Sequence, residues 1–241
     1  MIDIIALALA IKADQSEHDF SGATATAADI LTGKKAYVAN GNLVEGTYNK
    51  IAEILNRTVI TISAEELGDF IAASELQDGA VPMLGNYSIY ACFRLTHLTL
   101  PSNLKRVGQY ALGNLDSLSN GETKTFTFPD SVKQIDLNAM RNGSNGAPNL
   151  EHIIIGTGIG GGTLSGQTYN IGQNAFNGLT KLKDVTINYE SPLGALPVLQ
   201  NINAFPTSNT GFKIRVPNSM VSRYTSDTNW SALSSYITAI S

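Results

Sequence analysis

The fold is decided by one stretch of sequence, Ile171-Gly-Gln-Asn-Ala-Phe-Asn-Gly-Leu-Thr-Lys-Leu-Lys-Asp-Val-Thr-Ile187. It contains an apolar residue, a small alanine, a phenylalanine, and a final segment in which apolar and polar residues alternate. The same order returns in segments 89–101, 107–129, 135–155 and 202–217. The alternating triplets begin 27 to 32 residues apart, at Leu98, Phe126, Ile153, Val185 and Ile214.

A period of this length is typical of a stacked solenoid, because one such unit cannot bury its own apolar face and needs neighbouring copies. Strict alternation within each triplet predicts a short strand. The alanine suits a close approach of neighbouring backbones, and the phenylalanine, Phe93 in the first copy, is expected in the interior. The single Cys92 lies beside Phe93 and is interpreted as a small buried apolar residue.

The repeated phrase resembles the leucine-rich repeats of the BspA-like family over roughly residues 59–240. The best-matching copy carries Ile89, Ala91, Phe93, Leu95, Leu98, Leu100, Pro101 and Leu104. The resemblance implies an α+β leucine-rich-repeat solenoid with short strands and with helical caps at both ends. It also implies an extracellular binding or adhesion surface, because most proteins of this family act in that way.

The remaining sequence predicts smaller parts around this solenoid. Residues 1–22 are expected to form a helical arm and linker, with Ile4, Leu7 and Ile11 on one helical stripe that packs on further copies of the chain or anchors it to a partner. A frayed apolar arm is the alternative reading. Residues 23–50 contain Asn40-Gly41, a strong hairpin signal. Residues 51–88 are predicted to form the N-terminal cap, with a strand at 58–62 and a helix from Ser63 to about Ala73. The solenoid then spans 89–216 and the C-terminal cap 217–241.

The hairpin segment resembles a module of bacteriophage tail and baseplate structural proteins. The string Ala-Thr-Ala-x-Asp-Ile-Leu-x-Gly-Lys-x-Ala-Tyr-Val carries the match over residues 25–38, and Val44, Gly46 and Thr47 extend it. This resemblance implies a virion protein whose N-terminal part anchors it to a tail or baseplate.

Composition excludes several classes of function. The net charge is −4 and the sequence contains no basic run, which disfavours nucleic-acid binding. The longest apolar run is shorter than the roughly 18 residues of a membrane helix, so we expect no membrane insertion. Only 15% of the residues are charged, so the surface must consist largely of uncharged polar side chains.

The sequence offers little that could support catalysis, and we expect a protein that is not an enzyme. The segment 156–161 spells Gly-x-Gly-x-x-Gly, but no helix pattern follows it, and a nucleotide site needs one. We expect no cofactor and no metal, because His97 and His152 have no cysteine or carboxylate partner at ligand spacing. The segments 142–148 and 156–168 are interpreted as flexible insertion loops, which in repeat proteins often lie on a binding face.

The remaining candidate is a surface. The middle residue of each triplet should point outward, and the residue directly before each triplet should lie beside it on the same outward face. The predicted ligand-binding residues are His97, Thr99, Thr127, His152, Ile154, Asp184, Thr186, Lys213 and Arg215. A plain solvated sheet face is the alternative reading of this surface.

The preferred hypothesis is a bacteriophage tail-fibre or baseplate subunit that attaches the virion to a host-cell protein or glycan and acts outside the cell. The expected partners include other virion proteins and further copies of the chain, with a trimer favoured. A bacterial surface or secreted adhesion protein and a purely structural virion component are the alternatives.

Overall fold

The structure, a computed structural model, describes residues 35–37, 43–45, 58–62, 81–143, 148–164 and 166–240. The chain divides into two compact units, Met1–Glu53 and Ile54–Ser241. In the first unit, β1 (Lys35–Tyr37) and β2 (Leu43–Glu45) pair antiparallel, with Ala36 opposite Val44. This pair confirms the predicted hairpin. The predicted helix carrying Ile4, Leu7 and Ile11 and the predicted helix 63–73 lie outside the described residues.

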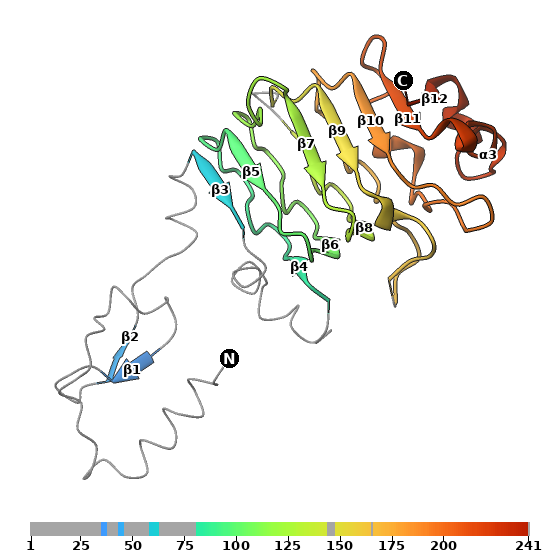
Figure 1. The fold of residues 1–241 in the computed structure, drawn as a ribbon. Coiled ribbons are helices and arrows are strands. Elements are labelled where there is room, and N and C mark those ends of the chain that lie inside the picture. Colours follow the sequence, from blue (N-terminus) through green and yellow to red (C-terminus); the bar gives the residue numbers. More distant parts are fainter. Residues whose placement is uncertain are drawn as a thin grey trace. The chain divides into compact units, whose positions relative to one another are not determined.

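The second unit contains a five-stranded parallel sheet, called the main sheet here. Figure 1 shows these strands side by side in chain order. Every neighbouring pair is parallel, as a solenoid requires, because each coil returns the chain to the same edge. The strands are β7 (Thr125–Phe128), β9 (His152–Ile155), β10 (Asp184–Ile187), β11 (Lys213–Val216) and β12 (Ile237–Ala239).

The alternation read from the sequence sets which side of the main sheet is buried. Phe126, Ile153, Val185 and Ile214 are in register and are all completely buried. Burying each such side chain contributes about 1.5–3 kcal/mol to stability. The residues between them point outward, since successive strand side chains alternate between faces.

Two strands near the N-terminal end of this unit form a separate parallel pair, β3 (Val59–Thr61) and β5 (His97–Thr99). The side chain of Asn120 explains why β5 does not continue into β7. Its Oδ1 accepts a hydrogen bond from the Leu98 N–H at 2.9 Å, and its Nδ2 donates to the Leu98 carbonyl at 3.2 Å. The amide therefore occupies the backbone groups that a neighbouring strand would use.

A second parallel sheet lies on the other side of each coil and was missed by the sequence analysis. Its strands are β4 (Met83–Leu84), β6 (Arg106–Val107) and β8 (Gln134–Ile135). Single bridges extend the order from Ile135 to Ile171 and on to Leu199. The inward residues of both sheets belong to one buried cluster. Strands of two residues are too short to show alternation, so sequence patterning could not find them.

The second sheet corrects the alignment of two repeat copies. Leu84, Val107, Ile135, Ile171 and Leu199 occupy one column, so the first copy begins at Leu84 and not at Ile89. Ile89 instead takes the place predicted for the phenylalanine, because its N–H donates to Ala111 as that of Phe176 donates to Ala204. Phe93 is 54% exposed, so its predicted interior position is wrong. Ile202, predicted to begin the fifth copy, is 44% exposed.

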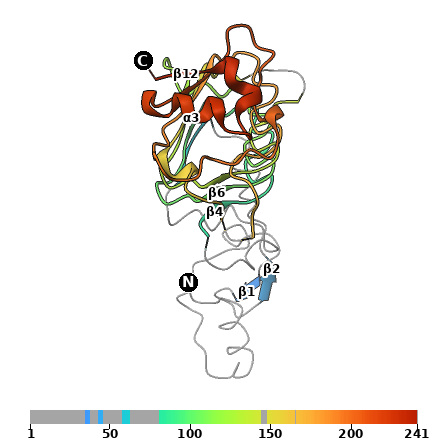
Figure 2. The same ribbon diagram turned by 90° about the vertical axis from the view of Figure 1, so that its right-hand side faces the viewer.

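The C-terminal residues end the stack with short helical segments and one more strand, and Figure 2 shows α3 and β12 in front of the coils. Tyr224 and Trp230 are completely buried, and the Trp230 Nε1 donates to the Pro197 carbonyl at 2.7 Å. Asn229 pairs with both backbone groups of Leu199, as Asn120 does with Leu98. The short helices of this unit are η4 (Thr157–Ile159), η5 (Ile202–Ala204), η6 (Asn218–Met220), α3 (Val221–Ser226) and η7 (Ser231–Tyr236).

Residues 156–168 were predicted to form a flexible insertion, and the structure corrects this. Gly156 and Gly158 lie against the backbone of Asp130, where a Cβ would approach it to 2.5 Å and 2.1 Å. Ile159 is completely buried in the core. The following residues fold over the outward side of the second sheet, where Gln167 Oε1 accepts a hydrogen bond from Gln134 at 2.9 Å. Gln134 is thereby completely buried.

Candidate binding surface

The outward side of the main sheet brings together most of the predicted site residues. Thr127, Ile154, Thr186 and Arg215 lie next to one another in register, and Thr238 of β12 continues the row. Thr127 is exposed, and the other residues of the row are half-buried. The row is polar except for Ile154, so it offers hydroxyl and guanidinium groups beside one apolar contact.

A second row runs parallel to the first at the start of each strand. It contains Thr125, His152, Asp184 and Lys213, which also lie next to one another in register. Lys213 is exposed, whereas Asp184 is 6% exposed. Lys213 forms no ion pair within the described part of the chain, so its charge is available to a ligand.

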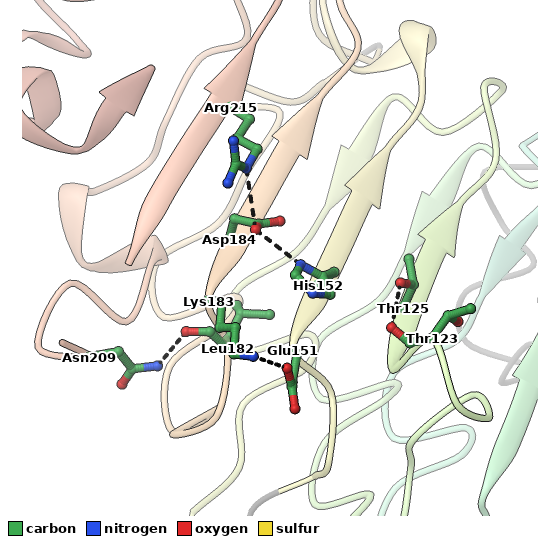
Figure 3. A network of polar contacts seen from close by, with 9 residues as sticks. All are labelled: Thr123, Thr125, Glu151, His152, Leu182, Lys183, Asp184, Asn209 and Arg215. Carbon is green, nitrogen blue, oxygen red and sulfur yellow. Dashed lines mark hydrogen bonds and ion pairs between the residues drawn. The ribbon is translucent and has the colours of Figure 1, made fainter. Parts of the chain in front are cut away.

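Asp184 is the centre of a polar network that joins the two rows, drawn in Figure 3. Its Oδ2 lies 3.0 Å from the His152 Nδ1 and 3.3 Å from the Arg215 Nε. The side chain of Asp184 is 8% exposed, whereas those of His152 and Arg215 are 38% and 34% exposed. A buried carboxylate between two more exposed nitrogen-bearing groups fixes their orientation, because each interaction restricts the rotamers of its partner.

A second acidic centre lies one residue before the strands. The Glu151 Oε1 accepts a hydrogen bond from the Lys124 Nζ at 2.5 Å, and its Oε2 pairs with Lys183. The hydrogen bond from Lys124, followed by that from Lys183, lowers the pKa of Glu151 from 4.5 to about 2. These residues were not predicted as part of the site, although Lys124, Glu151 and Lys183 share one repeat position with alternating charge.

Two predicted site residues do not join this surface. His97 and Thr99 lie on β5, which pairs with β3 and not with β7. His97 was predicted to lie in one surface with His152, but Asn120 interrupts the ladder between β5 and β7. His97 instead pairs through its Nδ1 with the Thr96 hydroxyl at 2.9 Å.

A cluster of three tyrosines was also not predicted from the sequence. Tyr87 stacks on Tyr110 with ring centroids 5.1 Å apart, and Tyr90 meets both rings edge-on. Tyr87 is 53% exposed. The related phrases Leu84-Gly-Asn-Tyr and Val107-Gly-Gln-Tyr place Tyr87 and Tyr110 at one repeat position. The misaligned first copy hid this correspondence.

Other kinds of site have little support within the residues that the structure describes. In these ranges, no group of three or more histidine, cysteine, aspartate or glutamate side chains could hold a metal ion. The described helices include none that is both long and apolar enough to cross a membrane. Cys92 is buried, and this burial raises the pKa of its thiol to about 11, which suppresses the reactive thiolate.

The chain was compared with protein families, curated proteins and solved structures, and the family match supports the repeat architecture. Residues 156–194 match the family described as BspA type Leucine rich repeat region (6 copies). The crystal structure of the pneumococcal vaccine antigen PcpA is similar at 18% sequence identity, with a TM-score of 0.45. The similarity covers 85% of this chain and 46% of that one, so the chain spans about half the length of PcpA. A search of curated proteins found no match.

The family match and the observed strands agree where they overlap. The matched residues contain β10 and the bridge residue Ile171, each paired in parallel with the coils before and after it. The described residues therefore have a parallel-strand, leucine-rich-repeat-like architecture with few helices, and the chain contains a BspA-type leucine-rich-repeat region at residues 156–194.

Proposed function

We propose that this chain is a non-enzymatic binding protein whose repeat unit attaches to a macromolecule at a cell surface through the outward side of the main sheet. The observation that carries the proposal is the registered pair of rows on β7 to β11, with Asp184 orienting His152 and Arg215. A rigid scaffold that presents oriented polar groups suits recognition. Leucine-rich-repeat families are also typically binding proteins.

The first candidate setting is a bacterial surface or secreted adhesion protein. The BspA-type region at residues 156–194 favours it. Most proteins of the BspA-like family, which the repeats resemble, are extracellular binding and adhesion proteins. In this setting the partner is a protein or glycan of another cell.

The second candidate setting is a virion, in which the chain is a tail-fibre or baseplate receptor-binding subunit or a structural component. The resemblance of residues 25–47 to tail and baseplate proteins favours it, and the β1–β2 hairpin lies within that segment. The stripe Ile4, Leu7 and Ile11 would then hold the chain in an oligomer, with a trimer favoured. Several copies would add avidity to weak individual contacts.

One experiment separates these settings. Antibodies against the chain, used for immunogold electron microscopy, should label either the cell envelope of the producing bacterium or the tail of purified virions. Envelope labelling supports the adhesion protein and argues against the virion protein. Tail labelling supports the virion protein and argues against the adhesion protein.

A second experiment tests the binding surface itself. Thr127 is exposed, so the variant Thr127→Arg adds bulk and charge to the outward row without entering the core. Binding is measured by flow cytometry with the labelled full chain, on cells that the labelled wild-type chain binds. We expect the affinity of the Thr127→Arg variant for these cells to fall about tenfold or more. The matched control is Ser222→Arg, at an exposed position of α3. Equal loss in both variants, or in neither, would contradict the proposed surface.

A further inference from the structure

We propose that the tyrosine cluster, Tyr87, Tyr90 and Tyr110, forms with Arg141 a second binding site, and that this site takes an acidic glycan. The site lies in the turns that directly follow the strands of the second sheet. Tyr87 follows Leu84, the last residue of β4, by three positions, and Tyr110 follows Val107, the last residue of β6, by three positions. It shares no residue with the outward rows of the main sheet. The proposal is therefore independent of the function proposed for those rows.

The backbone of this cluster is strained in a way that packing alone does not require. Tyr87 and Tyr110 have left-handed backbones, with φ of 59° and 53°. At the equivalent positions of the next coils the left-handed residues are Asn138 and Asn174, with φ of 58° and 57°. Asparagine tolerates this conformation, whereas a bulky side chain adopts it only at a cost. Two tyrosines held there suggest that the rings themselves are needed.

The rings form a surface and do not fill the core. Tyr87 is 53% exposed, and Tyr90 and Tyr110 are half-buried. Gly113 lies against the Tyr90 and Tyr110 rings, where an added Cβ would approach both to between 3.1 Å and 3.2 Å. The missing side chain lets the rings rest on the backbone. The face of an aromatic ring carries partial negative charge and attracts the weakly positive C–H groups on one side of a pyranose.

The phenol groups are oriented by neighbouring side chains. Asn114 Nδ2 donates to the Tyr90 hydroxyl at 2.8 Å, and Asn114 Oδ1 is fixed by the Gly143 N–H at 2.8 Å. Arg141 Nη1 donates to the Tyr110 hydroxyl at 3.3 Å. The phenol oxygens of Tyr90 and Tyr110 thus each accept a bond from the protein, and their own protons remain for an external acceptor. Sugar hydroxyl and ring oxygens are acceptors of this kind.

The charge of Arg141 selects the class of glycan. Its side chain makes no ion pair with a carboxylate in the described ranges, and the hydrogen bond to Tyr110 uses one of its five N–H donors. An uncompensated guanidinium beside aromatic rings complements a sugar that carries a carboxylate, because the guanidinium and carboxylate groups match in geometry.

The site also has a direction. Tyr87, Tyr110 and Arg141 come from three successive coils, which are spaced by about 4.8 Å per strand. The first and third coils are then about 10 Å apart. A ligand that contacts residues of all three coils extends along the stack, as a short chain of sugars does.

The test uses isothermal titration calorimetry of the full chain with two acidic probes, tetragalacturonate and a hyaluronan tetrasaccharide. Fully methyl-esterified tetragalacturonate has the same rings as the first probe without its charge. We expect at least one acidic probe to bind, and the ester to bind about fivefold or more weakly than tetragalacturonate if that probe binds. Arg141→Gln should lower the affinity for the acidic probe by a similar factor, because it removes the positive charge that pairs with the carboxylate of the probe.

The decisive variant is Tyr87→Asn, because asparagine occupies this position in two other coils. It should weaken glycan binding about tenfold while leaving the urea midpoint unchanged or raised, which separates loss of the ring from loss of the fold. The control is Phe93→Ala, which removes an aromatic side chain of similar exposure, 54%, that has no ring partner among the described contacts. Phe93→Ala should leave binding unchanged.

Three results would overturn the proposal. The first is that neither acidic probe binds at concentrations up to about 10 mM. The second is that the ester binds as tightly as tetragalacturonate. The third is that a proline-rich decapeptide binds the cluster and loses affinity in Tyr87→Asn while both acidic glycans fail to bind, which would assign the rings to a peptide partner.

Discussion

The main sheet and the second sheet enclose one buried core, but their outward residues have different surroundings. On the main sheet, Thr127 and Lys213 remain exposed, and the side chains paired with Asp184 are about one-third exposed. On the second sheet, Gln134 and Asp136 point away from the core and are nevertheless 0% and 3% exposed. The segment after Ile159 covers them.

The two sheets show how structural residues can be told apart from binding residues in a repeat protein. On the second sheet, buried polar groups bond to one another, as Gln134 Nε2 does to Asp136 Oδ1 at 2.6 Å. Polar residues on the main sheet are oriented by one buried partner and still reach solvent. The buried polar residues of the second sheet should therefore govern stability. The polar residues of the main sheet that reach solvent should govern binding.

The largest expected effect comes from the core that both sheets share. Phe176 is completely buried and lies between Phe128 and Phe205, with ring centroids 6.2 Å and 5.7 Å away. Phe176→Ala should lower the free energy of unfolding by about 3–5 kcal/mol through lost burial and a residual cavity. Urea denaturation followed by circular dichroism measures it. A loss below about 1 kcal/mol would mean that the two sheets do not share a packed core.

The next effect should appear on the covered second sheet. Asp136 accepts from the Arg106 Nε and Nη2 at 2.8 Å each, and its side chain is 4% exposed. Asp136→Ala should cost about 2–4 kcal/mol in urea denaturation, because it removes the buried carboxylate that pairs with Arg106 and one of the two acceptors of Gln134. The double variant with Arg106→Ala should be less destabilised than the sum of the single variants. Additive losses would show that the pair does not interact.

A smaller effect is expected when the charge of the buried aspartate on the open main sheet is removed. Asp184→Asn keeps the shape of the side chain and removes the charge that faces His152 and Arg215. Because both partners are about one-third exposed, the loss should be about 1 kcal/mol, measured by the same unfolding method. If it equals or exceeds the loss in Asp136→Ala, the proposed contrast between the two sheets is wrong.

The smallest effect concerns Glu151, whose pKa is lowered from 4.5 to about 2 by Lys124 and Lys183. A lowered pKa stabilises the folded state fully above pH 4.5, and this contribution is lost as the pH falls toward about 2. Stability of the wild type should therefore fall between these values more than that of Glu151→Gln, when melting temperatures are compared. Identical pH profiles would show that the pairs contribute nothing in solution, as many exposed pairs do.

Much of the fold could be predicted from the sequence, because its strongest pattern reports burial. Leu98, Phe126, Ile153, Val185 and Ile214 were all predicted as inward strand residues, and all are buried within strands. The second sheet could not be predicted, since its strands are two residues long. The break at Asn120 and the strand β12 depend on side-chain and edge pairing between coils, which no local pattern reports.

Part of the candidate site could also be predicted, because the alternation that reports burial also shows which strand residues point outward. Thr127, Ile154, Thr186 and Arg215 follow from alternation, and their register was confirmed. His97 and Thr99 were placed in this surface because repeat counting ignores a side chain that interrupts a ladder. The tyrosine cluster was missed because copies were aligned on Ile89 and not on Leu84.

The central claim, that the outward side of the main sheet is the contact surface, is tested most directly by placing a label on it. Cys92 is buried and is the single cysteine, so Thr127→Cys and Ser222→Cys each add one reactive thiol to the full chain. After coupling to a bulky maleimide at pH 7, the chain labelled at 127 should bind susceptible cells at least about tenfold more weakly than the chain labelled at 222. Equal binding by the two labelled chains would contradict the account.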